Sequence, residues 1–290
     1  MKKWKTVTIT ILVILVLWSI FQVYRSYYLL KESNYTVASE KTSKPIRFVT
    51  ISDQHDHLFG AANELLKEKV LECNPDLLFL DGDMINDNSG DCNELCTFIK
   101  DMTAHMPVYF ALGNHELGYM ENHPELIEQL EAAGAVVLDK EYVDIEVNGQ
   151  KLRIGGLYDF AFALDDYNST NPENMDSEVY EFLTDFEDTA VYKIMLAHRP
   201  ESFILGEAPA TWDIDLVVSG HAHGGQVVLP VLGPLWAPEQ GYFPDCVKGI
   251  HEYECFDIIV TSGLSSELDK IPRFNNPPDV MVVDLLPQGR

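Results

Sequence analysis

The run IRFVTISD (46–53) sets the pattern of this sequence, because a stretch of β-branched and aromatic residues ends there at a carboxylate. Two further runs repeat the pattern, DLLFLDGD (76–83) and PVYFALGNHE (107–116). Apolar residues at helical spacing fill the intervals at 61–72 and 91–104. Strands that alternate with helices predict an α/β fold, with a largely parallel sheet and helices on its face.

The second half of the chain has a more hairpin-like pattern. Residues 142–157 (YVDIEVNGQKLRIGGL) predict a β-hairpin with Asn148-Gly149 at its turn. A helix is predicted near 124–133, and residues 165–178 are acidic and typical of a loop. Shorter strands are predicted at 192–197, 215–219, 256–261 and 279–286.

Polar side chains mark the ends of five predicted strands. These residues are Asp53, Asp83, Asn114, His198 and His221, each within three residues of the carboxyl end of an apolar run. In open α/β sheets that edge is where ligands bind. We therefore expect the five side chains to converge in space, although the sequence separates them widely.

Three further histidines join this set: His55, His115 and His223. The spacings Asp53-x-His55 and His221-x-His223 put each pair on one side of an extended chain. A single histidine at a strand end is usually a packed core or surface residue, but eight such residues at successive ends form a pattern that chance does not explain. Their oxygen and nitrogen donors suit Mn, Fe or Zn, and their number makes two ions plausible.

The eight residues fall into five ordered motifs: Asp53-Gln54-His55, Gly82-Asp83-Met84-Ile85-Asn86, Gly113-Asn114-His115-Glu116, His198 and Gly220-His221-Ala222-His223. This order resembles the calcineurin-like metallophosphoesterases, whose pattern is D-x-H, GD-x-x-D, GNH[DE], a lone His and GH-x-H. The resemblance covers roughly residues 46–286 and implies a four-layer α/β/β/α sandwich with metals at the strand ends. Three stretches resemble a narrower bacterial group that is often membrane-attached: LAHRPE (196–201), GHAHGGQ (220–226) and RFNNPPD (273–279).

The resemblance also implies a role for each residue. Asp53, His55 and His223 would hold the first metal, Asn114, His198 and His221 would hold the second, and Asp83 would bridge both. A metal-bound hydroxide would attack phosphorus, and His115 would steady the phosphoryl oxygens or protonate the leaving group. One position departs from the family pattern, because Asn86 stands where the family has Asp. The residue at that position in the family generally does not ligate the metal itself. We therefore expect metal binding to be retained, with a changed affinity or ligand orientation.

The N-terminal segment predicts a membrane anchor. Residues 6–24 (TVTITILVILVLWSIFQVY) carry no charge, and a helix of this length spans about 28 Å. The basic residues in the short segment 1–5 favour an N-terminus inside the cell, which places the rest of the chain outside it. The segment 25–45 predicts a polar linker, and 46–290 the catalytic domain.

Charge and cysteine content exclude several classes of function. The formal net charge of −26 gives a field that repels nucleic acid. Five cysteines without a CxxC pair indicate neither a disulfide framework nor a thiolate zinc site. No G-x-S-x-G occurs, and His115-Glu116 lacks the second histidine of an HExxH peptidase because residue 119 is tyrosine.

The sequence therefore predicts a membrane-tethered, two-metal phosphoesterase. A non-catalytic, metal-stabilised binding module on the membrane is the alternative from another class. Monoesters and diesters both remain open as substrates, since both use the same metal core. Substrate choice is expected to lie in the loops 159–178 and 230–248, and the anchor makes a lipid-like or cell-envelope phosphoester attractive.

Overall fold

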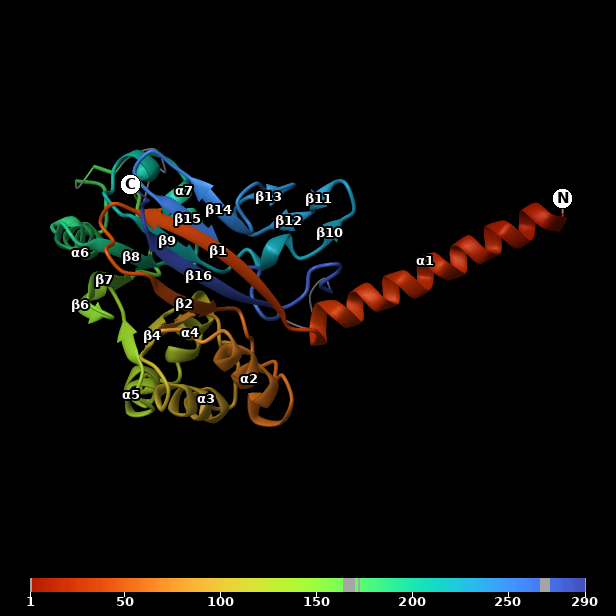
Figure 1. The fold of residues 1–290 in the computed structure, drawn as a ribbon, viewed down its shortest axis with the longest axis horizontal. Helices are drawn as coiled ribbons and strands as arrows, with labels where there is room; N and C mark the ends of the chain where they lie inside the picture. Colours follow the sequence, from red (N-terminus) through yellow and green to blue (C-terminus); the bar gives the residue numbers. More distant parts are fainter. Residues whose placement is uncertain (1, 164–169, 172, 267–271, 290) are drawn as a thin grey trace.

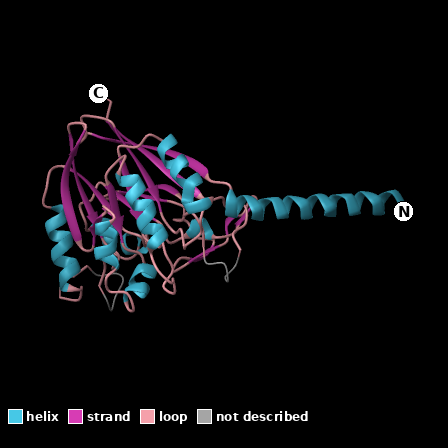
Figure 2. Ribbon diagram, turned by 90° about the horizontal axis from the view of Figure 1, so that it is seen from below, coloured by secondary structure: helices cyan, strands magenta, loops and turns pink. Residues whose placement is uncertain are grey.

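The computed structural model describes residues 2–163, 170–171, 173–266 and 272–289 of the protein. Two six-stranded sheets pack face to face, and helices cover their outer faces (Figures 1 and 2). This arrangement confirms the predicted α/β class and the four-layer α/β/β/α sandwich. A long N-terminal helix, α1 (Lys2–Tyr28), projects from the domain (Figure 1).

The first sheet contains the three strands that decide the fold. Its order is β1-β16-β2-β3-β4-β5, and all neighbours are parallel except β16 and β2. The strands are β1 (Lys31–Ser39), β16 (Asp279–Pro287), β2 (Ile46–Ile51), β3 (Leu77–Asp81), β4 (Val108–Ala111) and β5 (Val136–Leu138).

The second sheet has a parallel centre flanked by two antiparallel pairs. Its order is β14-β15-β9-β8-β7-β6. The strands are β14 (Gly249–Glu252), β15 (Asp257–Val260), β9 (Leu216–Ser219), β8 (Tyr192–Leu196), β7 (Gln150–Gly156) and β6 (Glu141–Val147). Asn148 and Gly149 both have positive φ at the β6–β7 turn, as the predicted hairpin requires.

Helices and small hairpins complete the chain. The helices are η1 (Ala61–Asn63), α2 (Glu64–Glu72), α3 (Asn93–Thr103), α4 (Asn114–Met120), α5 (Leu126–Ala132), α6 (Ser177–Glu187), α7 (Glu201–Ile204), η2 (Ala208–Ala210) and η3 (His223–Gly225). Two hairpins pair β10 (Val228–Leu229) with β11 (Gly233–Pro234) and β12 (Trp236–Ala237) with β13 (Gly241–Tyr242). Of the predicted loop at 165–178, residues 164–169 and 172 lie outside the described residues, and α6 begins at its end.

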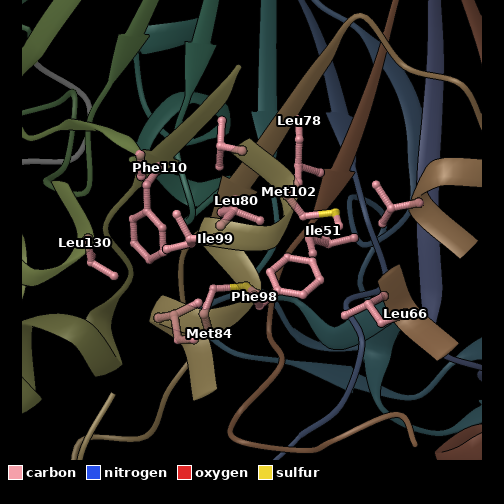
Figure 3. Packing of buried hydrophobic residues seen from close by; sticks show 14 of the residues in the cluster. Ile51, Leu66, Leu78, Leu80, Met84, Phe98, Ile99, Met102, Phe110 and Leu130 are labelled. Atoms are coloured by element: carbon pink, nitrogen blue, oxygen red, sulfur yellow. The ribbon is translucent and has the colours of Figure 1, made fainter. Parts of the chain in front are cut away.

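The strand β3 shows how one sequence run serves two core layers. Its alternate side chains point to opposite faces of the sheet. Leu78 and Leu80 pack in the cluster that contains Phe98 of α3 (Figure 3), whereas Leu77 and Phe79 pack between the two sheets. Because both faces are buried, the strand is apolar throughout, and each such side chain contributes roughly 1.5–3 kcal/mol to folding.

The prediction of a linker over 25–45 is wrong. Helix α1 continues to Tyr28, and β1 pairs with β16 along its whole length. Tyr35 and Val37 pack against the core between the sheets, while Asn34, Thr36 and Ala38 are exposed. An edge strand with one solvated face has polar residues at alternate positions, which explains why composition alone indicated a linker. Only residues 29 and 30 separate the helix from the sheet, so the domain does not hang from a long flexible tether.

Helix α1 is long and apolar enough to cross a membrane by length and composition, and it is the only such helix in the part of the chain that the structure describes. Residues 3–18 are exposed, but one face of the last third packs on the domain. Gln22 and Ser26 are buried there, and Ser26 Oγ accepts a hydrogen bond from the backbone N–H of Asn276 at 2.9 Å. The C-terminal end of the helix is therefore docked on the folded domain.

Candidate metal centre

The loops that follow successive strands bring the predicted site residues together. Asp53 and His55 follow β2, Asp83 follows β3, His198 follows β8 and His221 follows β9. Their donor atoms belong to overlapping groups in which all atoms lie within 4.8 Å of one another. The predicted convergence at the strand ends is therefore what the structure shows.

Four groups could each hold a cation, and each shares a member with the next. The groups are Asp53, His55 and His223; His55, Asp83 and His115; Asp83, His198 and His221; and Glu201, His221 and Glu239. His198 Nε2 lies 3.0 Å from Asp83 Oδ2, and His223 Nδ1 lies 3.7 Å from Asp53 Oδ1. Asn114 lies beside His198 in the wall of the same small pocket. Asp83 thus stands between two sets of donors.

Several of these donors are buried without a hydrogen-bond partner. Asp53 Oδ2, His55 Nε2 and Asn114 Oδ1 have no partner within the protein, although each atom is shielded from solvent. An unsatisfied buried polar atom costs about 1–3 kcal/mol, so a fold does not retain three of them together without a reason. Cations coordinated by these atoms would satisfy them, and the residues present fit a metal centre.

Hydrogen bonds at the outer nitrogen orient the rings of His198 and His55. His198 Nδ1 donates to the backbone carbonyl of Asp81 at 2.7 Å. His55 Nδ1 lies 3.0 Å from Oδ1 of Asn86, an oxygen that can only accept. A proton on Nδ1 leaves the lone pair of Nε2 directed into the cluster, which is the usual arrangement of a metal-ligating histidine.

His115 has the opposite tautomer. Its Nδ1 accepts a hydrogen bond from the backbone N–H of Asp87 at 3.3 Å. The neutral ring therefore carries its proton on Nε2, where it can donate rather than ligate. This difference separates His115 from His55, although their ring centroids are only 4.7 Å apart.

The electrostatics of the cluster favour bound cations. Burial alone would raise the pKa of the Asp83 carboxyl, yet the facing His198 ring holds it well below its usual range. Burial lowers the pKa of the His223 imidazole to about 3, so that ring is neutral and able to ligate. Burial also lowers the pKa of His198, but Asp83 outweighs this effect and raises it to about 10. The direction of the shift shows that the carboxylates of Asp83, Asp53 and Asp81 favour a positive charge at this position.

The backbone at the cluster is strained. Five of the predicted ligands have positive φ, between 44° and 59°: Asp53, His55, Asp83, His221 and His223. The left-handed region is uncommon for residues other than glycine, and strain of this kind concentrates at functional sites. Gly113 and Gly220 allow the loops to approach closely, since a Cβ on Gly113 would lie 2.3 Å from Asp83 Oδ1.

Comparison with known proteins agrees with this geometry. The family model for calcineurin-like phosphoesterases matches residues 46–225, which is more than half of the chain. This chain belongs to the calcineurin-like phosphoesterases. It is a metal-dependent hydrolase of phosphoric esters, as the motifs predicted.

Relatives of this phosphoesterase align along most of its length. It is 27% identical over 269 residues to an uncharacterized metallophosphoesterase of Aquifex aeolicus (strain VF5), covering 90% of this chain and 94% of that one. It is 25% identical over 250 residues to the phosphodiesterase YaeI of Escherichia coli (strain K12), covering 83% of each chain. Among solved structures, it is similar to a 5′-nucleotidase precursor from Thermus thermophilus, with a TM-score of 0.48 and 17% identity over 84% of this chain and 54% of that one.

Glu116 organises the phosphoesterase site in a way that the sequence analysis missed. Its buried carboxylate accepts hydrogen bonds from the backbone N–H groups of Asp83 at 2.7 Å, Met84 at 2.8 Å and Gly113 at 2.9 Å. Burial, together with the charge of Asp83, raises the pKa of Glu116 to about 7. One side chain thus ties the loop after β3 to the loop after β4. The signal was its place after Asn114-His115, at the third position of a helix.

Arg273 has a comparable role on the other side of the site. The side chain is fully buried and donates to the carbonyls of Ser262, Ser265 and Asn276 at 2.8, 2.6 and 3.2 Å. The carbonyl of Ser265 also lies 3.0 Å from His223 Nδ1. Arg273 therefore fixes the loop that orients His223, and the sequence had shown it only as part of the run RFNNPPD.

Two cavities open beside the metal centre. A small one of about 70 Å³ is lined by Asn114, His198 and Arg199, and places a guanidinium near the cluster. A larger one of about 590 Å³ runs from His55, His115 and His223 to apolar residues of the β10–β13 segment.

Glu239, between β12 and β13, is a further polar contact of the site that the sequence did not reveal. Its Oε2 lies 3.1 Å from His221 Nε2.

Proposed function

We propose that this phosphoesterase hydrolyses a phosphate mono- or diester with two bound metal ions. The observation that carries the proposal is the position of Asp83, whose carboxylate lies within 4.8 Å of donor atoms of His55 on one side and of His198 and His221 on the other. The unpartnered buried oxygens of Asp53 and Asn114 lie one in each proposed half of the site. A single ion would leave one of these halves unsatisfied.

The proposed ligands follow from the donor groups and the family pattern. Asp53, His55 and His223 hold the first ion, Asn114, His198 and His221 hold the second, and Asp83 contacts both. The oxygen and nitrogen donors, with no thiolate, suit Mn, Fe or Zn.

The described residues divide the chemical work between them. Bound divalent ions supply Lewis acidity and an activated water for in-line attack on phosphorus. Water adds to phosphorus as the bond from phosphorus to the leaving oxygen breaks, and that oxygen must gain a proton. His115 holds a proton on Nε2 at the wall of the larger cavity, so it serves as the donor to the leaving oxygen or to a phosphoryl oxygen.

The proposal extends to location and substrate. Helix α1 anchors the enzyme in a membrane, with Lys2, Lys3 and Lys5 on the cytoplasmic side and the catalytic domain outside. A site held at that surface favours a lipid-like or cell-envelope phosphoester.

The test uses the full chain in detergent, stripped of metal and reloaded with Mn, Fe or Zn. Hydrolysis of p-nitrophenyl phosphate and bis(p-nitrophenyl) phosphate should appear only after reloading. Metal binding without hydrolysis of any mono- or diester would instead support the non-catalytic binding module.

A further inference from the structure

Residues 226–243, here called the apolar arm, expose more apolar surface than any other part of the domain that the structure describes. The arm comprises the hairpins β10–β11 and β12–β13, and it projects towards the side of the domain from which α1 leaves (Figure 1). Its exposed large apolar residues are Val231, Leu232, Trp236, Tyr242 and Phe243. Residues 226–238 carry no charge, in a protein whose net charge is −26. An exposed apolar patch of this kind marks a binding surface.

The apolar side chains at the tip of the arm are exposed to solvent, which is energetically unfavourable. Val231 is fully exposed and has a φ of 73°, which a β-branched residue rarely adopts. Leu232 beside it is 64% exposed. Water does not favour either exposed side chain, and the backbone at Val231 is strained as well, so the partner that covers the tip must be apolar.

Phe274 joins the arm to the anchor helix. Its backbone N–H donates to the carbonyl of Gln226 at 3.2 Å, and its carbonyl accepts from the N–H of Val228 at 3.0 Å. Its ring packs edge-on against Trp18 of α1, with ring centroids 5.5 Å apart. Trp18 lies ten residues before the end of α1 at Tyr28, which is about 15 Å along the helix axis. The base of the arm is therefore level with the apolar part of the helix.

Polar contacts hold the other end of the arm to the catalytic body. Glu239 contacts His221 at 3.1 Å, and Gln240 Nε2 donates to Glu201 Oε1 at 2.7 Å. The side-chain oxygen of Gln240 also accepts from the N–H of Cys246 at 3.1 Å. The arm is thus fixed at the anchor helix and at the metal centre, so its position relative to both is defined.

The cavity of about 590 Å³ lies between the metal centre and the arm. His55, His115 and His223 line it on the side of the metal centre, and Trp236 and Tyr242 line it on the side of the arm. A cavity of this size holds a drug-sized group, and an apolar wall that ends at a few polar residues sets the orientation of an amphiphile.

We propose that the apolar arm inserts into the bilayer that α1 crosses, and that the enzyme takes a membrane lipid phosphoester directly from it. The apolar part of the lipid lies along Trp236 and Tyr242, and the phosphate reaches the metal centre beside His115. This substrate class rests on the function proposed for the site. The partner that covers the arm is a lipid surface, because Phe274 places the arm against the one described helix that could span a membrane.

The charge of the protein sets the expected lipid preference. Insertion of the arm, whose residues 226–238 carry no charge, is driven by burial of apolar area. The acidic domain is repelled by anionic lipids, so docking should occur on zwitterionic phosphatidylcholine and should change little with salt.

The first experiment places a reporter at the tip. The full chain with Leu232→Trp is reconstituted in phosphatidylcholine nanodiscs, and its fluorescence is compared with that of the parent, which supplies the signal from the native tryptophans. Brominated lipid should quench the added tryptophan. The matched control is Val136→Trp, at an exposed position of β5 on the edge of the first sheet opposite β1; it should not be quenched. An unquenched Leu232→Trp overturns the proposal, and a dimer of the full chain with that result would assign the surface to a second copy.

The second experiment measures hydrolysis. The double variant Val231→Asn/Leu232→Ser should lose about tenfold in kcat/KM on phosphatidic acid or phosphatidylglycerol in nanodiscs, because less apolar area enters the bilayer. Its activity on p-nitrophenyl phosphate and bis(p-nitrophenyl) phosphate should be unchanged, because neither residue lines the cavity. The control Val136→Asn should leave both kinds of substrate unaffected.

The outcomes separate this proposal from the function on which it rests. A chain whose tip is quenched but which hydrolyses no phosphoester refutes the proposed enzyme and retains the docking. Full activity on soluble esters with none on lipid esters refutes the lipid substrate. Equal losses of kcat/KM on lipid and soluble esters in the double variant would show that the arm shapes the active site and does not bind the membrane. That result would overturn the proposal.

Discussion

His55 Nδ1 lies 3.0 Å from Oδ1 of Asn86, the residue that stands where the family pattern has aspartate. The amide also uses its Nδ2, which donates to Asp56 Oδ2 at 2.8 Å and to the carbonyl of His55 at 3.2 Å. An aspartate at position 86 would place a carboxylate against that of Asp56, whereas the amide satisfies both neighbours. The departure from the family pattern therefore retains the hydrogen bond that orients His55.

The first prediction concerns this contact. Asn86→Ala should weaken metal binding about 10- to 100-fold, because loss of an orienting partner leaves the ligand ring less well placed. Competition with a fluorescent chelator measures the affinity. The control is Asn122→Ala, an exposed asparagine beyond α4, which should bind metal like the parent. Unchanged affinity in Asn86→Ala would show that His55 does not depend on this contact.

The second prediction concerns metal content. The purified full chain should approach two transition-metal equivalents under metal-replete conditions, and Asp83→Asn should lower this content because it removes the charge shared by two donor groups. Elemental analysis gives the number directly. Full activity with a content that stays near one equivalent would disprove the two-ion site.

The third prediction separates chemistry from metal binding. His115→Ala should keep its metal and its fold but lose roughly two to four orders of magnitude in rate, the usual scale for a positioned proton donor. The measurements are steady-state kinetics and metal content on the same sample. If His115→Ala lost metal as readily as Asp83→Asn, His115 would have to be reassigned as a ligand.

The fourth prediction follows from the edge strand. A soluble fragment that begins at residue 40 lacks β1 and exposes the edge of β16, whereas one that begins at residue 29 keeps the sheet complete. The shorter fragment should melt at a lower temperature or aggregate, since the buried Val37 and the Ser33–Asp279 hydrogen bond are lost. Thermal unfolding followed by circular dichroism compares the two. Equal melting temperatures would mean that residues 31–39 contribute little to stability.

The fifth prediction concerns topology. A membrane-impermeant amine reagent added to intact cells should label the exposed Lys44 and Lys151 of the domain but not Lys2 or Lys3. Any outer wall is removed first, and lysed cells serve as the control in which both ends react. Labelling of the domain only after lysis would place the catalytic site in the cytoplasm, and the candidate substrates would then be intracellular.

The sequence predicted the parts of this protein whose physical signal is local. Runs such as DLLFLDGD show a strand because both faces of a central strand are apolar, and the carboxylate follows where the strand ends. Asn148-Gly149 predicts its turn because both positions require positive φ. The ordered motifs placed Asp83 and His115 at strand ends, and these are the residues that the structure brings together.

Other features depend on contacts between residues far apart in the chain, and only the tertiary structure decided them. The polar run at 31–39 is a strand because β16, more than 240 residues later, offers it an edge. Glu116 and Arg273 matter because backbone groups of distant loops converge on them. The apolar arm is interpreted as a membrane-binding surface because Phe274, at its base, packs against Trp18 of the anchor helix. Local composition predicts strands, turns and donor types, because those depend on neighbours in sequence. The position of the apolar arm next to the metal centre and the anchor helix depends on contacts between residues far apart in the chain, so local composition does not predict it.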